Sequence, residues 1–392
     1  MANPVGCPSS GQPRPTYRIA DIVRRHRKAL RVTHVLTLDQ RRLLGAIAVC
    51  RTPALGGLLH YCPTCVEVHP VYHSCRKRGC PNCQALSQEK WIAARAERIL
   101  PIKHFHVTFT LPSELRRLAK GHPKDVYNAF FRVVGEILEE LALSHYGVQL
   151  GWTAVLHTWR RDLGDHPHIH VLVTAGGLLL DGSVFVPIRD TYLFSGEVLG
   201  KMLLGKMLEA LQGLFDKGAF PELDEDAFGA MMAKSAAYKK WVVNVQPPFR
   251  DASHLLGYLG RYVHRIALSD SRLKEVTPDR VTFSTRDRKT VSMPPVTFLH
   301  RFLQHVLPQG FHKVRHGGLY ASTRKGGRLE QARALLAQQV DPVEAKTEKT
   351  ETTETLEGEA LKGPLCPTCD GIMVPMNVRL PRMRAPPGGT NA

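Results

Sequence analysis

The chain has 392 residues, a formal net charge of +18 and a pI near 9.7, so two or three folded units and a polyanionic partner, above all nucleic acid, are expected. No run reaches the ~18 apolar residues of a membrane span. Residues 1–17 are rich in Pro, Gly and Ser and lack the apolar core of a signal peptide, so a cytoplasmic, nucleoid-associated protein without membrane attachment is expected.

The first elements in chain order are helical and cysteine-rich. Residues 17–48 alternate charged and apolar positions at helical spacing and predict an amphipathic lead-in. Two Cys-x-x-Cys pairs, Cys62/Cys65 and Cys80/Cys83, follow with fourteen residues between them. In a reducing compartment such pairs favour one tetrahedral structural Zn²⁺ over disulfides. The alternative is a cluster of buried or redox-active thiols.

Other residues near these pairs leave alternatives open. Candidates for competing ligands or a second site are Cys50, His69, His73 and Cys75. The basic run Arg76, Lys77 and Arg78 is predicted to contact DNA phosphates, against the alternative of a solvated charge run. A third pair, Cys366/Cys369, has no downstream partner and fits a ligand pair or a half-site equally well.

The middle of the chain predicts an α+β fold. A helix-like segment, residues 86–100, ends before Pro101, and strands are predicted over 103–111, 152–159 and 168–174, with a helix over 125–143. Such an order favours an antiparallel sheet with helices packed on it, beside a small zinc module. The expected domains are residues 1–98, 99–272 and 273–336, followed by an acidic, disordered linker (337–362) and a tail (363–392).

Histidines mark one face of the predicted sheet. His168 and His170 alternate on one strand and therefore share a face, which suits a divalent ion. His106, on the polar face of residues 103–111, is the predicted third ligand of an open catalytic site for Mg²⁺ or Mn²⁺. The alternative is a set of hydrogen-bonded structural histidines.

A predicted helix over residues 253–268 presents Tyr258 and Tyr262 four residues apart and hence on one face. Arg261 and Arg265 flank them as predicted DNA contacts. A phenol with an ordinary pKa of about 10 needs a nearby cation to attack phosphorus. The alternative is a pair of tyrosines packed at the edge of the core.

These motifs resemble those of the HUH endonucleases, and the chain is similar over residues 50–318 to the IS91-type rolling-circle transposases. The segments that carry the resemblance are Cys50–Thr52, Ser74–Arg78, Cys80–Gln84, Phe105–Pro112, His166–His170, Tyr258–Arg265 and residues 305–318. One departure is Gly79, which stands where that family usually carries a histidine.

The resemblance implies a transposase that nicks single-stranded transposon ends through a 5′-phosphotyrosine and then transfers the strand. It implies His168 and His170 as metal ligands, Tyr258 and Tyr262 as nucleophiles, and a zinc module that serves DNA recognition. A rolling-circle replication initiator shares these motifs and remains an alternative. A non-catalytic zinc DNA-binding protein is the alternative outside the enzymes.

Overall fold

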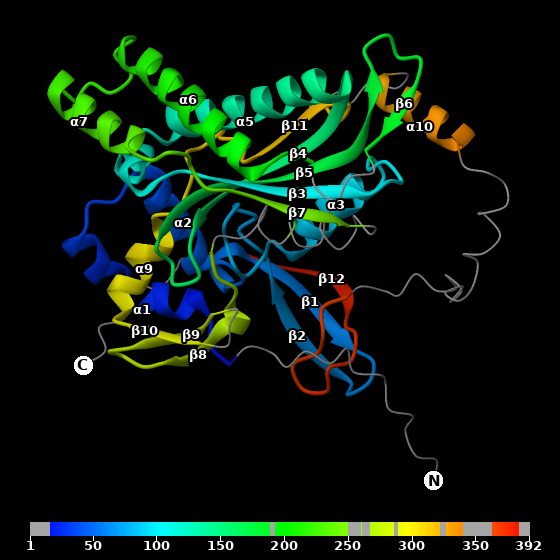
Figure 1. The fold of residues 1–392 in the computed structure, drawn as a ribbon. Helices are drawn as coiled ribbons and strands as arrows, with labels where there is room; N and C mark the ends of the chain where they lie inside the picture. Colours follow the sequence, from blue (N-terminus) through cyan, green and yellow to red (C-terminus); the bar gives the residue numbers. More distant parts are fainter. Residues whose placement is uncertain are drawn as a thin grey trace. The chain divides into compact units, whose positions relative to one another are not determined.

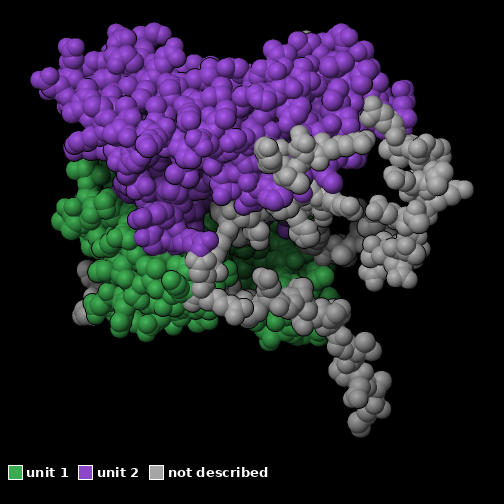
Figure 2. Space-filling model, in the orientation of Figure 1, with its two compact units in different colours: residues 1–85, 268–303, 350–392 green, residues 86–267, 304–349 purple. Residues whose placement is uncertain are grey.

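A computed structural model gives the structure of the chain and describes residues 16–188, 193–249, 260, 267–285, 289–321, 327–339 and 363–383. The chain divides into two units, each made of segments far apart in sequence (Figure 2). Unit 1 comprises residues 1–85, 268–303 and 350–392, and unit 2 comprises residues 86–267 and 304–349. The consecutive domains expected from the sequence therefore differ from these interleaved units.

Unit 2 is built on an antiparallel sheet with the strand order β11-β4-β5-β3-β7, and β6 pairs with β5 (Figure 1). Its strands are β3 (His104–Thr110), β4 (Val148–Trp159), β5 (Asp165–Leu179), β6 (Phe185–Pro187), β7 (Val243–Phe249) and β11 (Val314–Gly318). The antiparallel sheet and its packed helices confirm the predicted α+β class.

One face of this sheet carries the main core. Alternate side chains of β3 and β5, among them Phe105, Phe109 and Val171, are fully buried there with helix α5 (Pro123–Tyr146). Burying each such side chain contributes about 1.5–3 kcal/mol. The other helices of unit 2 are α3 (Ala85–Ala96), α4 (Arg116–Gly121), α6 (Gly196–Phe215), α7 (Glu225–Ala236) and α10 (Arg328–Gln339), with a 3₁₀ turn at Ser113–Leu115.

The opposite face of the sheet is mixed. Val155 of β4 and Leu172 of β5 are buried there beneath Trp91 and Ile92 of α3. Because side chains alternate along a strand, His157 and His170 lie on this same face.

The turn from β4 to β5 is held by His305, which is buried. Its Nε2–H donates to the carbonyl of Leu163 at 3.1 Å, so Nδ1 carries the lone pair and accepts from the Thr158 hydroxyl at 3.2 Å. This histidine therefore fixes where the strand with the His168 and His170 pair begins.

Unit 1 combines a helical cluster and two small sheets. The helices are α1 (Ile19–Thr33), α2 (Leu38–Val49) and α9 (Pro295–Leu303), with 3₁₀ turns at Pro53–Leu55 and Asp270–Arg272. One sheet, β10-β9-β8, has strands β8 (Leu273–Val276), β9 (Val281–Ser284) and β10 (Thr290–Met293). The other, β12-β1-β2, has β1 (Gly57–Cys62), β2 (Glu67–Tyr72) and β12 (Val374–Leu380).

The predicted elements that fall on described residues occur in the structure with shifted ends. The lead-in splits into α1 and α2, because Thr37 and Gln40 form a capping box that starts a new helix. Two elements that the sequence did not predict, α10 and β12, follow Leu319. Of the predicted linker (337–362), residues 337–339 form the end of α10, and the rest lies outside the described residues. Among those that are described, no helix is long and apolar enough to cross a bilayer.

A glycine in β11 should tolerate no side chain. Gly317 lies opposite Trp152, and a Cβ added to it would sit 1.9 Å from the indole ring. We expect Gly317→Ala to lower the free energy of unfolding by roughly 1–3 kcal/mol through overpacking. The control is Gly205→Ala on α6, where a Cβ meets nothing within 4 Å and helix propensity should raise stability by up to about 1 kcal/mol. Equal urea midpoints for the two variants would contradict this packing.

The buried imidazole at residue 305 should make stability depend on pH. Burial lowers the pKa of His305 from 6.5 to about 4. Between pH 6.5 and 4 the unfolded chain binds a proton at this imidazole and the folded chain does not. The free energy of unfolding is therefore highest above pH 6.5 and falls by about 3 kcal/mol for this group as the pH drops towards 4. In urea unfolding from pH 7 to 4, His305→Gln should flatten that fall, while His145→Gln on the surface should not. An unchanged slope in His305→Gln would refute the assignment.

Candidate functional site

Three imidazoles converge on the mixed face of the unit 2 sheet. His157, His168 and His170 bring one ring nitrogen each to within 4.8 Å of one another. The ring centroid of His157 lies 5.2 Å from that of His168 and 4.4 Å from that of His170. The centroids of His168 and His170 are 4.7 Å apart. The predicted pair, His168 and His170, thus lies together, and the third histidine of the cluster is His157.

The predicted third ligand, His106, occupies a different place. In the β3–β5 ladder His106 lies opposite Leu172, whereas in the β4–β5 ladder His157 lies opposite His168. His106 therefore lies opposite a residue two positions beyond His170 on β5, and not opposite the His168 and His170 pair. The sequence contained the signal for His157, because it alternates with Thr153 and Val155 on a predicted strand.

His106 instead contacts the histidine trio from outside. Its Nδ1–H donates to the amide oxygen of Gln246 at 3.0 Å, so its Nε2 accepts from Nδ1–H of His170 at 2.9 Å. Thr108 also lies 3.1 Å from that Nδ1 atom. These contacts place the lone pair of His170 on Nε2 and orient its ring, as partners of metal-bound histidines commonly do.

His168 is oriented in the same way by the backbone. Its Nδ1–H donates to the carbonyl of His166 at 2.6 Å, which leaves the ring's lone pair on Nε2. Burial lowers the pKa of His168 to about 4 and also lowers the pKa of His106. Both imidazoles are thus neutral at neutral pH, which is the form that binds metals.

The tyrosine helix predicted over residues 253–268 lies almost wholly outside the described residues, and with it Tyr258, Tyr262, Arg261 and Arg265. Gly260, midway between the two tyrosines in sequence, is described and buried. A Cβ added to it would lie 2.4 Å from Ile92, the α3 residue that packs on Val155 and Leu172. Gly260 therefore lies on the side of the sheet that carries the histidines.

The cysteines of unit 1 form two groups of four. One group is Cys50, Cys75, Cys80 and Cys83, and the other is Cys62, Cys65, Cys366 and Cys369. The predicted site of Cys62, Cys65, Cys80 and Cys83 is therefore divided between them. In each group the four sulfur atoms lie within 4.8 Å of one another, and none of the described cysteines forms a disulfide.

The β1–β2 hairpin explains this division. Cys62 ends β1 and Cys65 lies in the turn that follows, so both sit at the tip, about 17 Å along the strand from Gly57. Cys50 and Cys75 flank the base, where the backbone N–H of Cys75 donates to the sulfur of Cys50 at 3.4 Å. The pair Cys80/Cys83 joins them there. The side-chain hydrogen bond between Cys75 and Cys50 is the largest of the effects that lower the pKa of Cys50 to about 7.

The basic run between Cys75 and Cys80 lies on a loop of the first group. Arg76, Lys77 and Arg78 are all exposed. The carbonyl of Lys77 accepts hydrogen bonds from the backbone N–H of Cys80 at 3.1 Å and from the side chain of Gln84 at 2.8 Å. The loop is therefore anchored next to the cysteines while its cationic side chains face solvent.

Comparisons with known proteins place the chain in a family. A family model described as "Putative transposase" matches residues 151–327, and one described as "Transposase zinc-binding domain" matches residues 22–111. The first range contains the histidine trio, and the second contains all of the Cys50 group and only half of the Cys62 group.

Two relatives agree with these models. The chain is 35% identical over 380 residues to "Putative transposase y4qJ" of Sinorhizobium fredii, which covers 92% of this chain and 95% of that protein. It is 27% identical over 286 residues to the "Transposase for insertion sequence element IS801" of Pseudomonas savastanoi pv. phaseolicola, with 70% of this chain and 68% of that protein covered. No solved structure matches the chain. With a zinc-binding domain, a histidine-bearing antiparallel sheet and a relative matched along nearly its whole length, the chain belongs to the IS91 family of transposases.

Proposed function

We propose that this transposase cuts one strand of single-stranded transposon-end DNA and transfers it through a phosphotyrosine, with a divalent cation at the histidine trio. The observation that carries the proposal is the convergence of His157, His168 and His170 on one sheet face, with Gly260 against α3 on the same side. The predicted nucleophiles, Tyr258 and Tyr262, each lie two residues from Gly260 in the sequence.

The donor set fits a catalytic cation. Three imidazole nitrogens leave part of the coordination sphere open, as catalytic sites require. When bound, the ion supplies a Lewis acid for a phosphoryl oxygen. Of Mg²⁺ and Mn²⁺, three nitrogen donors favour Mn²⁺, because Mg²⁺ prefers oxygen ligands. His106 acts as a positioning residue through its hydrogen bond to His170.

The tyrosines supply the covalent chemistry. The phenol oxygen of Tyr258 or Tyr262 attacks phosphorus and loses its proton, while the P–O3′ bond breaks and the leaving oxygen gains a proton. The products are a 5′-phosphotyrosine and a free 3′-hydroxyl. Attack by another 3′-hydroxyl reverses the step and joins two strands. Arg261 and Arg265 would favour the phenolate and contact the DNA backbone.

DNA binding is assigned in part to unit 1. Arg76, Lys77 and Arg78 are exposed on a loop anchored beside the Cys50 group, where a structural zinc ion would hold the loop rigid. Such phosphate contacts position a nucleic acid without reading its sequence. The net charge of +18 agrees with this role.

A covalent adduct tests the proposal directly. We expect labelled single-stranded transposon-end DNA and Mn²⁺ to give an SDS-resistant adduct whose phosphotyrosine maps to Tyr258 or Tyr262 by mass spectrometry. Replacing both tyrosines with phenylalanine should abolish the adduct, because the attacking oxygen is removed. Tyr238→Phe, at a partly exposed tyrosine bonded to Glu114, is the matched control and should retain it.

The competing functions give different results in that assay. A replication initiator would nick a plasmid origin and leave transposon ends uncut. A non-catalytic zinc protein would bind DNA but form no adduct under any condition. Adduct formation by the double phenylalanine variant would remove the tyrosines from the mechanism.

A second test separates ligand from positioning residue. We expect His157→Ala and His168→Ala each to slow nicking on the order of 1000-fold while DNA affinity is retained, because the cation's stabilisation of several kcal/mol is lost. His106→Gln removes only an outer contact and should cost about 10- to 100-fold. Single-turnover rates against Mn²⁺ concentration distinguish the two classes. A His157→Ala variant as active as wild type would show that His157 is no ligand.

A further inference from the structure

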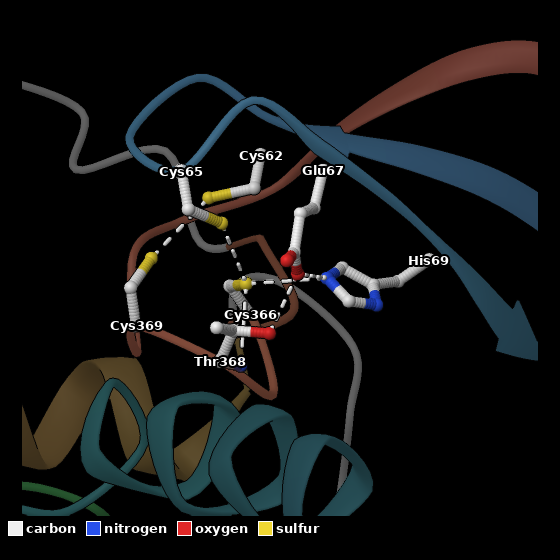
Figure 3. A network of polar contacts seen from close by, with 7 residues as sticks. All are labelled: Cys62, Cys65, Glu67, His69, Cys366, Thr368 and Cys369. Carbon is white, nitrogen blue, oxygen red and sulfur yellow. Dashed lines mark hydrogen bonds and ion pairs between the residues drawn. The ribbon is translucent and has the colours of Figure 1, made fainter.

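The second cysteine group joins two distant parts of the chain. Cys62 and Cys65 lie at the tip of the β1–β2 hairpin, and Cys366 and Cys369 lie just before β12 (Figure 3). The sulfur atoms of Cys62 and Cys369 are 3.5 Å apart, as are those of Cys65 and Cys366. Thiolates around one tetrahedral zinc ion, with Zn–S bonds of about 2.3 Å, lie roughly 3.8 Å apart. A disulfide would need about 2.05 Å.

The two halves are built alike. Both read Cys-Pro-Thr-Cys, and the residue that follows each, Val66 or Asp370, has a left-handed φ of 61° or 58°. In each loop that residue's N–H donates to the carbonyl of the first cysteine, at 2.9 Å from Val66 to Cys62 and 3.1 Å from Asp370 to Cys366. A β-branched valine rarely adopts such a φ. The local backbone preference of valine therefore does not account for the conformation of this loop.

The loops also direct their polar groups at the sulfur atoms and pack tightly. The N–H of Thr368 lies 3.4 Å from the sulfur of Cys366. A Cβ added to Gly371 would lie 2.7 Å from the hydroxyl of Thr64 in the opposite loop, so no larger residue fits between the two halves. This close approach brings four thiols together in a pattern that only a shared ion makes favourable.

Apolar burial does not explain why β12 pairs with β1. The ladder runs from Gly57 opposite Leu380 to Tyr61 opposite Val374. Val374, Met376 and Val378 of β12 are nevertheless all exposed. A small sheet with so little buried apolar surface is only marginally stable by itself and needs a further stabilising interaction.

We propose that Cys62, Cys65, Cys366 and Cys369 bind a second structural zinc ion, which fastens residues 363–383 to the β1–β2 hairpin. The matched zinc-binding domain ends at residue 111 and so includes only half of these ligands. The proposal rests on unit 1 alone and is independent of the nicking mechanism.

A mixed ligand set is the competing arrangement. Cys65, Glu67, His69 and Cys366 also gather their donor atoms within 4.8 Å of one another. Glu67, however, already pairs with His69 at 3.0 Å and accepts from the hydroxyl of Thr368 at 2.6 Å. His69 lies 3.5 Å from the sulfur of Cys366, where it serves as an outer hydrogen-bond partner to a thiolate (Figure 3).

Metal analysis of the full-length protein tests the proposal. We expect the Cys366→Ser/Cys369→Ser variant to hold one zinc equivalent fewer per chain than wild type, and Glu67→Gln/His69→Asn to hold the wild-type amount. Hydrogen exchange over residues 374–380 should rise in the cysteine variant only. An unchanged zinc content in the cysteine variant would overturn the proposal, and a loss of zinc in the Glu67/His69 variant would favour the mixed set.

Residue-resolved alkylation of the wild-type protein keeps the test valid if the cysteine variant does not fold. Cys369 is exposed, so a thiol reagent would reach it at once unless zinc holds the thiolate. Mass spectrometry should find Cys369 protected until a chelator is added, and then modified together with Cys62, Cys65 and Cys366. Immediate modification of Cys369 in the zinc-loaded protein would refute the site.

Discussion

The antiparallel register between β4 and β5 decides which imidazoles can meet. It sets His157 opposite His168 and leaves His106, on β3, opposite Leu172. The register itself is held from the other face, where Ile169, Val171 and their neighbours are fully buried. A slip of one residue would turn the histidines into the core and the apolar side chains outward. The register that buries the core on one face of the sheet therefore also brings the three histidines together on the other face.

Sequence reasoning succeeded where a feature is local. Alternation along single strands predicted the histidine face, the α+β class and the strands that became β3, β4 and β5. It failed where strands or loops meet, because partners and registers depend on contacts distant in sequence. His157 was missed for that reason. The Cys62/Cys65 pair was grouped with Cys80/Cys83 because spacing cannot show that a six-residue strand separates them. β12 went unnoticed since its exposed side chains carry no burial pattern, and only its pairing with β1 defines it.

The two kinds of candidate metal site differ in the way that their tasks require. Four thiolates close the coordination sphere and suit an ion that only joins backbone segments. Three imidazoles would leave the coordination sphere of a bound ion open, which suits the catalysis proposed above. Two of them are oriented by outer partners: His106 contacts His170, and the carbonyl of His166 contacts His168. The cysteine groups belong to unit 1 and the histidine trio to unit 2.

The pairing of a hairpin near residue 62 with a loop near residue 369 also has a consequence during protein synthesis. Cys62 and Cys65 are translated long before Cys366 and Cys369, and the entire sheet of unit 2 lies between the two pairs in sequence. During that interval the hairpin would carry only two of the four ligands of the proposed site. A product truncated before residue 366 would lack the partners that the proposed site gives to Cys62 and Cys65, which would leave those two thiols open to oxidation. Occupancy of the proposed site would thus require a chain translated past residue 369.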